Sequence, residues 1–236
     1  MYWAHKAALL STGPDGIPLH GMPMSDAASH DVHALFPHLK QLFEDHPELV
    51  GKFSNILADS AWDDEVLKQR VKTEFGLNLK TPVNPRGIKT LIEGLGRGMK
   101  TLSPTGALTC DAGRVMEYLG IRFQTENFLY GPPKLENGQV ACATCPLRAT
   151  CCRGDTEGGR CVAVKFEQLP HIDPGDPPMA RRFKAIMRKR TAIERAIKRI
   201  KFDFGDDHLT RRGNDAFQAH IDRSLIAFHL MLRLDC

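Results

Sequence analysis

The segment 181–201, RRFKAIMRKRTAIERAIKRIK, places the strongest constraint on what this chain can fold into. Read as a helix at about 100° per residue, it gathers its apolar side chains on one stripe. That stripe comprises Phe183, Ile186, Ile193, Ile197 and Ile200. The remaining positions hold ten Lys or Arg residues and a single acid, Glu194. The segment therefore predicts a helix that buries one face and exposes a strongly cationic one.

Glu194 lies at the edge of the apolar stripe, in one narrow sector with Met187, Arg190 and Lys201. Two interpretations are open. In the first, the segment is a solvated basic helix, and Glu194 pairs only with Arg190 or Lys198. In the second, Glu194 binds a divalent metal ion while the surrounding cations hold nucleic-acid phosphates. The rest of the chain has to decide between them.

The charge of the chain is unevenly distributed. The formal net charge is only +4, but cations dominate 181–212 whereas 26–65 is rich in acids. This asymmetry favours an anionic partner near the C-terminal third, and nucleic acid fits best. No apolar stretch is long enough to span a bilayer, and the first residues lack the pattern of a signal peptide. We therefore expect a cytoplasmic protein without a membrane partner.

Residues 1–83 begin with a hairpin pattern. Strands over 2–10 and 17–24 flank a turn that contains Pro-Asp-Gly. Ser29-His-Asp can cap a helix that runs to Glu44, although Pro37 should kink or split it. A helix over 63–75 follows, and the next strand covers 77–83. The side chains of the helix that are predicted to face inward are Val66, Leu67, Val71 and Phe75. The succession predicts an α/β fold, a mixed sheet flanked by helices.

Asp59 ends the short apolar run 53–59, at the carboxyl end of a predicted strand. Open α/β sheets place their ligands at such ends, so Asp59 is a candidate functional carboxylate. A turn or helix-initiating aspartate is the competing interpretation. Ser60, Asp63 and Asp64 could take that structural role instead.

Residues 84–178 have a different character, with frequent Gly and Pro and short predicted β runs, as in an insertion that packs on the main domain. Most of the seven cysteines fall here. Cys142 and Cys145 form a CxxC pair, the spacing with which one tight turn supplies two ligands to tetrahedral Zn²⁺. Cys151 lies close by, and the fourth ligand remains open among Cys110, Cys152 and Cys161. The alternative is a set of reduced cysteines without metal. Our preferred Zn²⁺ set is Cys110, Cys142, Cys145 and Cys151.

Residues 179–236 are predicted to be helical. After the basic helix, Arg211 and Arg212 form a second basic group in a loop. Asp215 is expected to cap a last amphipathic helix, which is apolar enough to be packed. Its His220 and His229 are expected on the surface or in the core rather than as ligands.

Two stretches resemble DDE transposases of bacterial insertion sequences, close to the insertion sequence 4 group. Ile56-Leu-Ala-Asp59-Ser-Ala-Trp62-Asp63 is similar to the strand that carries the family's second catalytic aspartate. Arg190, Glu194 and Lys201 match the spacing of the family's Tyr-Arg-Glu-Lys motif, with Met187 at the Tyr position. The cysteine-rich segment resembles an insertion that many such enzymes carry before the catalytic Glu. The resemblance spans nearly the whole chain.

The resemblance implies an RNase H-like catalytic domain that cleaves phosphodiester bonds and transfers strands at transposon ends. It implies Asp59 and Glu194 as ligands of Mg²⁺ (or Mn²⁺), with Arg190 and Lys201 on the active-site phosphates. DNA-backbone contacts would come from Lys198, Arg199, Arg211 and Arg212. The family's first catalytic Asp is expected on a strand upstream of Tyr2, so this chain is expected to be a fragment with little activity alone. A homodimer in a synaptic complex is the expected assembly.

Two other classes of function remain open. The first is a non-catalytic, zinc-containing DNA-binding or regulatory fragment, which binds DNA without metal-dependent nicking. The second is an interaction protein with no nucleic-acid role, whose weak DNA binding would be insensitive to salt.

Overall fold

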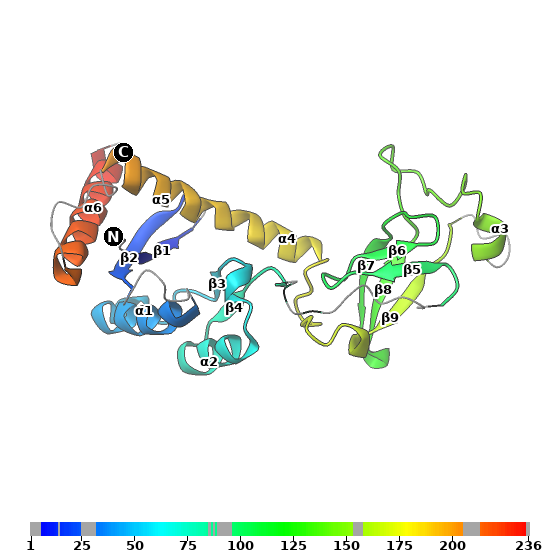
Figure 1. Cartoon of the computed structure of the whole chain (residues 1–236), viewed down its shortest axis with the longest axis horizontal. Helices are drawn as coiled ribbons and strands as arrows, with labels where there is room; N and C mark the ends of the chain where they lie inside the picture. Colours follow the sequence, from blue (N-terminus) through cyan, green and yellow to red (C-terminus); the bar gives the residue numbers. More distant parts are fainter. Residues whose placement is uncertain are drawn as a thin grey trace, which may run out of the picture. The chain divides into compact units, whose positions relative to one another are not determined.

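A computed structural model of the chain describes residues 6–13, 15–24, 32–84, 86, 88, 96–152, 158–204 and 213–234. The chain forms two compact units. Unit 1 combines Met1–Pro82 with Ile186–Cys236, and unit 2 is Val83–Ala185. Unit 2 thus interrupts unit 1 in the sequence, over nearly the segment 84–178 expected to be an insertion. The architecture is mixed α/β with several small sheets (Figure 1).

Unit 1 holds two separate pairs of strands. β1 (Ala7–Thr12) and β2 (Ile17–Pro23) are antiparallel, whereas β3 (Asn55–Leu57) and β4 (Asn78–Lys80) are parallel. Both kinds of pairing that a mixed sheet needs are therefore present. Among the described residues, however, no strand joins the two pairs into the single sheet expected from the sequence.

The turn between β1 and β2 depends on a glycine. Gly16 has a φ of +68°, which a residue with a side chain rarely adopts. A β-carbon at Gly16 would also lie 2.3 Å from the carbonyl oxygen of Ala192. The hairpin can therefore approach the helix that contains Ala192 only because this position has no side chain. The predicted strand residues 2–5 lie outside the described part of the chain.

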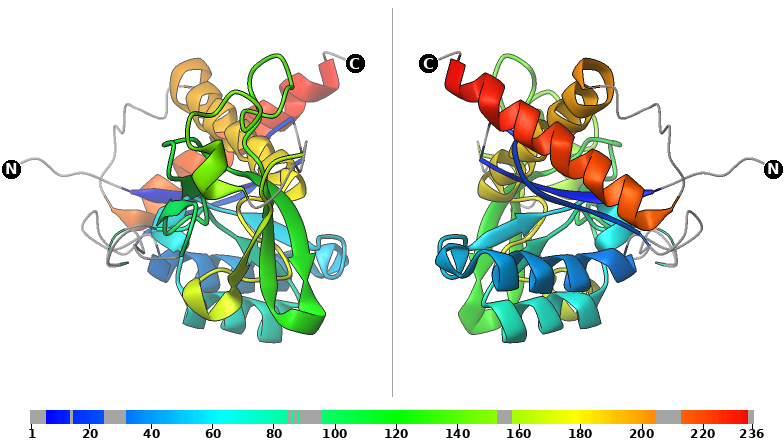
Figure 2. Two further views of the ribbon diagram at one scale, coloured as in Figure 1. Left: turned by 90° about the vertical axis from the view of Figure 1, so that its right-hand side faces the viewer. Right: turned by 90° about the vertical axis from the view of Figure 1, so that its left-hand side faces the viewer.

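Helices α1 (Val32–Asp45) and α2 (Glu65–Phe75) cover one face of the unit 1 strands. Figure 2 shows these two helices on one side of the strands and α5 and α6 on the other. The shared core of α1, α2 and β4 contains Leu35, Leu39, Leu67, Val71, Leu77 and Leu79. Short 3-10 turns η1 (Pro47–Leu49) and η2 (Ser60–Trp62) connect the elements.

Two local expectations in this region were wrong. Of the kink or split expected at Pro37, the split is wrong: α1 continues through this residue, and its Leu35, Leu39 and Leu42 are almost fully buried. Val66 does not face inward and is 70% exposed, since Leu67 and Val71 already fill the buried stripe of α2. The predicted caps of α1, Ser29 and Asp31, lie outside the described residues.

The segment 181–201 is not one uniform α-helix. It consists of α4 (Arg181–Met187), the 3-10 turn η5 (Arg188–Arg190) and α5 (Thr191–Asp203). A 3-10 turn advances about 120° per residue instead of 100°, so the apolar stripe is shifted across η5. The buried residues of α5 are Ala192, Ala196 and Ile200, while Ile197, predicted to be buried, is 38% exposed.

The C-terminal helix α6 (Asn214–Leu234) packs against β2 in unit 1. Asp215 lies in its first turn rather than before it, since the helix already begins at Asn214. Phe217, Ile221 and Phe228 are buried, but α6 also exposes part of its apolar surface, contrary to expectation. Its exposed apolar side chains are Ile226, Leu230 and Met231. Among the described helices, none has the length and apolar character needed to cross a bilayer.

Unit 2 is built from short antiparallel strands, as its sequence predicts. A three-stranded sheet has the order β7 (Glu117–Arg122), β8 (Asn127–Gly131), β9 (Val162–Lys165). A hairpin of β5 (Met99–Leu102) and β6 (Leu108–Cys110) accompanies it. The short helices are η3 (Phe123–Thr125), α3 (Arg148–Cys151) and η4 (Phe166–Gln168). The core includes Leu102, Leu108, Phe128, Tyr130, Val164 and Leu169.

Candidate functional site

A cavity of about 210 Å³ lies between the two strand pairs of unit 1. Its walls come from β1 and β3, from α1, and from the junction of η5 with α5. The lining includes Leu9, Ser11, Leu39, Phe43, Asn55, Leu57, Arg190 and Ile193. Segments that are more than a hundred positions apart in the sequence therefore meet around one space.

Asp59 is exposed and lies two residues beyond the carboxyl end of β3. Its Oδ1 accepts a hydrogen bond of 2.8 Å from the backbone nitrogen of Ala61, which caps the η2 turn. Asp59 therefore has the structural role in a turn that was the competing interpretation of this residue. The capping bond uses one carboxylate oxygen and leaves the side chain accessible to solvent.

The neighbouring acids Asp63 and Asp64 have structural roles as well. Asp64 caps α2, accepting a 2.7 Å hydrogen bond from Leu67 N. Asp63 is largely buried, and its carboxylate contacts both the Lys68 ammonium and the Thr81 hydroxyl. Asp63 thereby ties α2 to the end of β4. Of these three acids, Asp63 is the least available to a ligand, whereas Asp59 and Asp64 are exposed and each accept one capping bond.

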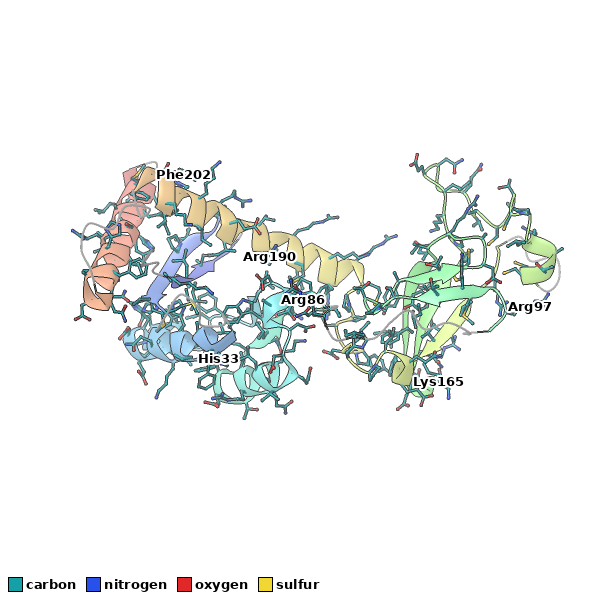
Figure 3. The ribbon with its side chains drawn as sticks, in the orientation of Figure 1. His33, Arg86, Arg97, Lys165, Arg190 and Phe202 are labelled. Carbon is teal, nitrogen blue, oxygen red and sulfur yellow. The ribbon has the colours of Figure 1, made fainter. Side chains whose placement is uncertain are left out.

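Glu194 forms an ion pair with Arg190, one helical turn before it, at 3.0 Å between Oε1 and Nη2. The sequence left two interpretations of Glu194 open, an ion pair with a neighbouring cation or a metal ligand, and this ion pair is the first of them. It is weak, because the Glu194 side chain is 56% exposed and exposed pairs at this spacing contribute only about 0.3–0.5 kcal/mol. Arg190 projects where α4 gives way to α5 and also lines the cavity (Figure 3). A stronger partner, such as a metal ion or a phosphate, could displace either member of the pair at little cost.

The other predicted cations differ in their availability. Lys198 and Lys201 are exposed on α5. Arg199 packs over the ring of Phe228 at 4.5 Å and contacts Asp203 at 3.4 Å, so part of its side chain serves to join α5 and α6. The predicted contacts Arg211 and Arg212 lie outside the described residues.

The structure brings some of the predicted residues to one place and leaves others apart. Arg190 and the β3 residues that precede Asp59 line the same cavity, whereas Asp59 and Glu194 are not among its lining residues. Within the described part of the chain, no group of three or more His, Cys, Asp or Glu side chains is arranged to hold a metal ion. Carboxylate oxygens are suitable ligands for Mg²⁺, but the chain supplies two predicted carboxylates here rather than a complete site.

The cysteines of unit 2 gather around a cavity of about 30 Å³. Its lining includes Cys110, Cys142, Cys145, Cys151 and Cys152. Cys142 and Cys145 lie in one turn, with Cys145 N donating to Cys142 O at 3.3 Å. Cys161 is exposed and not among the lining residues. The four thiols predicted to bind Zn²⁺ thus line one cavity, and Cys152 lines it as well.

The thiols have the donor chemistry of a zinc site but not its arrangement. They belong to the described residues, among which no metal-holding group of three is formed. Burial raises the pKa of the Cys152 thiol, and the nearby Cys151 and Cys142 raise it further. Cys152 is therefore held in its neutral form, which is a poorer ligand than a thiolate.

One pair of titratable residues, of which His38 is buried, was not predicted from the sequence. The rings of His20 on β2 and His38 on α1 lie 4.8 Å apart, and His38 is only 1% exposed. Burial lowers the pKa of His38 to about 4, and the neighbouring His20 lowers it further. The available signal was the position of His38, three residues after Leu35 and four before Leu42, on the apolar face of a predicted helix.

Neither protein-family models, nor curated proteins, nor solved structures give a match to this chain. Any function assigned to the carboxylates of unit 1 and the thiols of unit 2 therefore has to come from the chemistry and placement of the residues themselves.

Proposed function

We propose that the chain is the catalytic part of a DNA transposase, which cleaves and joins phosphodiester bonds at transposon ends with the help of divalent metal ions. The observation that carries the proposal is the spacing of Arg190, Glu194 and Lys201 on a basic helix. Unit 1 adds support, because Arg190 and the strand leading to Asp59 line one cavity. An RNase H-like fold is part of the proposal. It is supported by an antiparallel and a parallel strand pair with helices on both sides.

Each residue has a distinct role in this proposal. Asp59 and Glu194 would hold Mg²⁺ or Mn²⁺, which when bound activates a nucleophile and stabilises the leaving oxygen. Arg190 would release Glu194 and turn to a phosphate, since their exposed ion pair is weak. Lys201 would neutralise a neighbouring phosphate, and the exposed Lys198 would contact the DNA backbone without reading its sequence.

The first test is the binding of Mn²⁺, followed by electron paramagnetic resonance. Asp59→Asn and Glu194→Gln are each expected to weaken Mn²⁺ binding by about tenfold or more, because each removes a ligand charge. Glu65→Gln is the matched control, since Glu65 is an exposed acid in the first turn of α2. Equal Mn²⁺ affinity in all three variants would remove both carboxylates from the mechanism.

The second test separates DNA binding from metal binding. The affinity for duplex DNA, measured by fluorescence anisotropy, should fall steeply with salt, because each neutralised phosphate contributes about −0.9 to the slope of log K against log salt. Lys198→Ala should make that slope shallower by about one unit, while Glu194→Gln should retain DNA binding. A salt-independent affinity would contradict any role in DNA binding.

A second candidate is a zinc-containing DNA-binding or regulatory fragment without catalytic activity. It is favoured by one observation, the gathering of Cys110, Cys142, Cys145 and Cys151 around a single cavity. About one zinc per chain is expected by elemental analysis, lost in Cys142→Ser and retained in the exposed control Cys161→Ser. Zinc and DNA binding without Mn²⁺ binding would favour this candidate over the first.

A further inference from the structure

The two strand pairs of unit 1 each have one edge without a partner strand. β1 pairs with β2 alone, and β3 pairs with β4 alone, among the strands of the described residues. Residues of both β1 and β3 line the cavity. An unpaired strand edge is a template for another strand.

The free edge of β3 can be assigned residue by residue. Ser54 O accepts from Asn78 N and Ala58 N donates to Lys80 O, each at 3.0 Å. The backbone groups of successive residues in a strand point to opposite sides, so the groups of Asn55 and Leu57 point away from β4. Asn55 and Leu57 are both lining residues of the cavity.

The free edge of β1 follows from the same alternation. Met24 N donates to Lys6 O at 2.7 Å, which makes every second residue of β1 a partner of β2 and leaves the backbone of Leu9 on the other side. The extra residue of the bulge, Leu19, belongs to β2, so the alternation along β1 continues and the backbone of Ser11 lies on the same side as that of Leu9. Leu9 and Ser11 also line the cavity.

The cavity is too large for a packing defect. Its volume of about 210 Å³ is more than ten times the roughly 10–15 Å³ that one water requires. Leu39 and Phe43 of α1 line it, as do Ala192 and Ile193 of α5. The space thus has apolar walls from two helices and backbone hydrogen-bonding edges from two strands. These are the four surroundings of a central strand in a sheet covered on both faces.

We propose that this cavity is the binding site for one extended apolar peptide strand, which pairs with β1 and β3 and joins the two pairs into a single five-stranded sheet. β1 has six residues and β3 has three, so the strand needs about four to six residues in contact, at about 3.3 Å each. With helices on both faces, successive Val, Ile or Leu residues fit better than an apolar–polar alternation.

The charge at the cavity adds a second element of specificity. Lys189 and Arg190 line it, and both carry a positive charge. A strand with a carboxylate at the end nearest these two side chains is therefore favoured over one with a cation there. The proposal uses the backbone edges and not the carboxylates of the chain, so it does not rest on the proposed catalytic function.

The experiment adds a synthetic peptide to the full chain. The peptide has about five Val and Ile residues in succession, two Lys residues before them for solubility and one Asp after them. Exchange of backbone amides is followed by nuclear magnetic resonance. Saturating peptide should slow exchange at Leu9, Ser11, Asn55 and Leu57 by roughly tenfold or more, because these are the amides that acquire partners. A peptide of the same sequence with an N-methyl group on every Val and Ile residue should give no protection, because it cannot donate to either strand.

Protein variants test the same edge from the other side. Asn55→Pro removes an N–H that β4 does not use, so the β3–β4 pairing should survive, which retained protection of the Ala58 and Asn78 amides would verify. Asn55→Ala is the matched control, since it changes the side chain and keeps the N–H. Peptide affinity should fall about tenfold or more in Asn55→Pro and stay unchanged in Asn55→Ala.

Three outcomes would overturn the proposal. The first is equal binding of the N-methylated peptide, which would reveal an apolar contact without strand pairing. The second is equal peptide affinity of Asn55→Pro and Asn55→Ala. The third is protection of the same amides by self-association of the chain with no response to peptide, which would make a second copy the occupant.

Discussion

The two units differ in how their strands are completed. In unit 2, β8 pairs with β7 on one side and β9 on the other, and its Phe128 and Tyr130 are 0% and 1% exposed. The buried Tyr130 hydroxyl donates to Gly106 O at 2.7 Å, so even the polar end of this ring is satisfied. In unit 1, no described strand has partners on both sides, and a cavity occupies the space between the pairs. Unit 2 therefore has one strand, β8, that its own chain completes on both edges, whereas unit 1 has none among its described strands.

The largest effect is expected at β8, the strand with partners on both edges. Phe128→Ala should destabilise unit 2 by about 3–5 kcal/mol, because the ring is fully buried and the surrounding sheet cannot collapse into the space. Native-state hydrogen exchange should report the loss at amides of β7, β8 and β9 while amides of unit 1 keep their protection. Phe123→Ala is the control, since Phe123 is 61% exposed, and should cost far less. Equal loss of protection in both units would contradict their separation.

The second prediction concerns the pH dependence of unit 1. His38 has a pKa of about 4 in the folded chain and 6.5 when unfolded. Between these values the unfolded state binds a proton that the folded state does not. Stability should therefore decrease as the pH is lowered from about 6.5 and level off near 4, by about 3 kcal/mol in total. Amides of α1 and β2 should lose protection over this range, and those of unit 2 should change little.

The variant His38→Leu separates this effect from general acid denaturation. Leu keeps an apolar side chain at a buried site and cannot be protonated, so the pH dependence between about 6.5 and 4 should largely disappear. His33→Leu is the matched control, since His33 is exposed on the same helix. A pH profile that is unchanged in His38→Leu would show that other groups cause the acid sensitivity.

The sequence predicted local patterns better than the completion of sheets. The Pro-Asp-Gly hairpin, the parallel strands around α2 and the short β runs of unit 2 were found, because turn residues and apolar periodicity act over a few positions. The separation of the two strand pairs was not found, since pairing is decided by contacts between distant segments. The register of α5 was also missed. The 3-10 turn η5 shifts the buried face of α5, and no feature of the run of Arg and Lys predicts this turn.

For the candidate site, the sequence identified the residue types but not which residues lie close to one another in the fold. Only the contacts of Asp63 distinguish it from the capping residues Asp59 and Asp64, because all three acids fit the same turn pattern. Cys152 was left open as one of three ligands, and its place among the other thiols depends on the fold of 142–152. His20 lies on a strand and His38 on a helix, so their proximity depends on how β2 packs against α1 and could not be predicted from either position alone.

The smallest effect on stability is expected on the surface of α5. It tests whether the Glu194 carboxylate is available to a ligand or is needed for the stability of unit 1. Glu194→Gln should change the stability of unit 1 by less than about 0.5 kcal/mol, since its ion pair with Arg190 is exposed. Asp203→Asn is the matched control, because Asp203 forms the equivalent pair with Arg199 on the same helix. Chemical denaturation should give similar small values for both. If Glu194→Gln instead destabilised unit 1 by more than about 1 kcal/mol, the carboxylate would be a structural part of α5. Its exposure to solvent would then no longer mark it as a group kept free for a ligand.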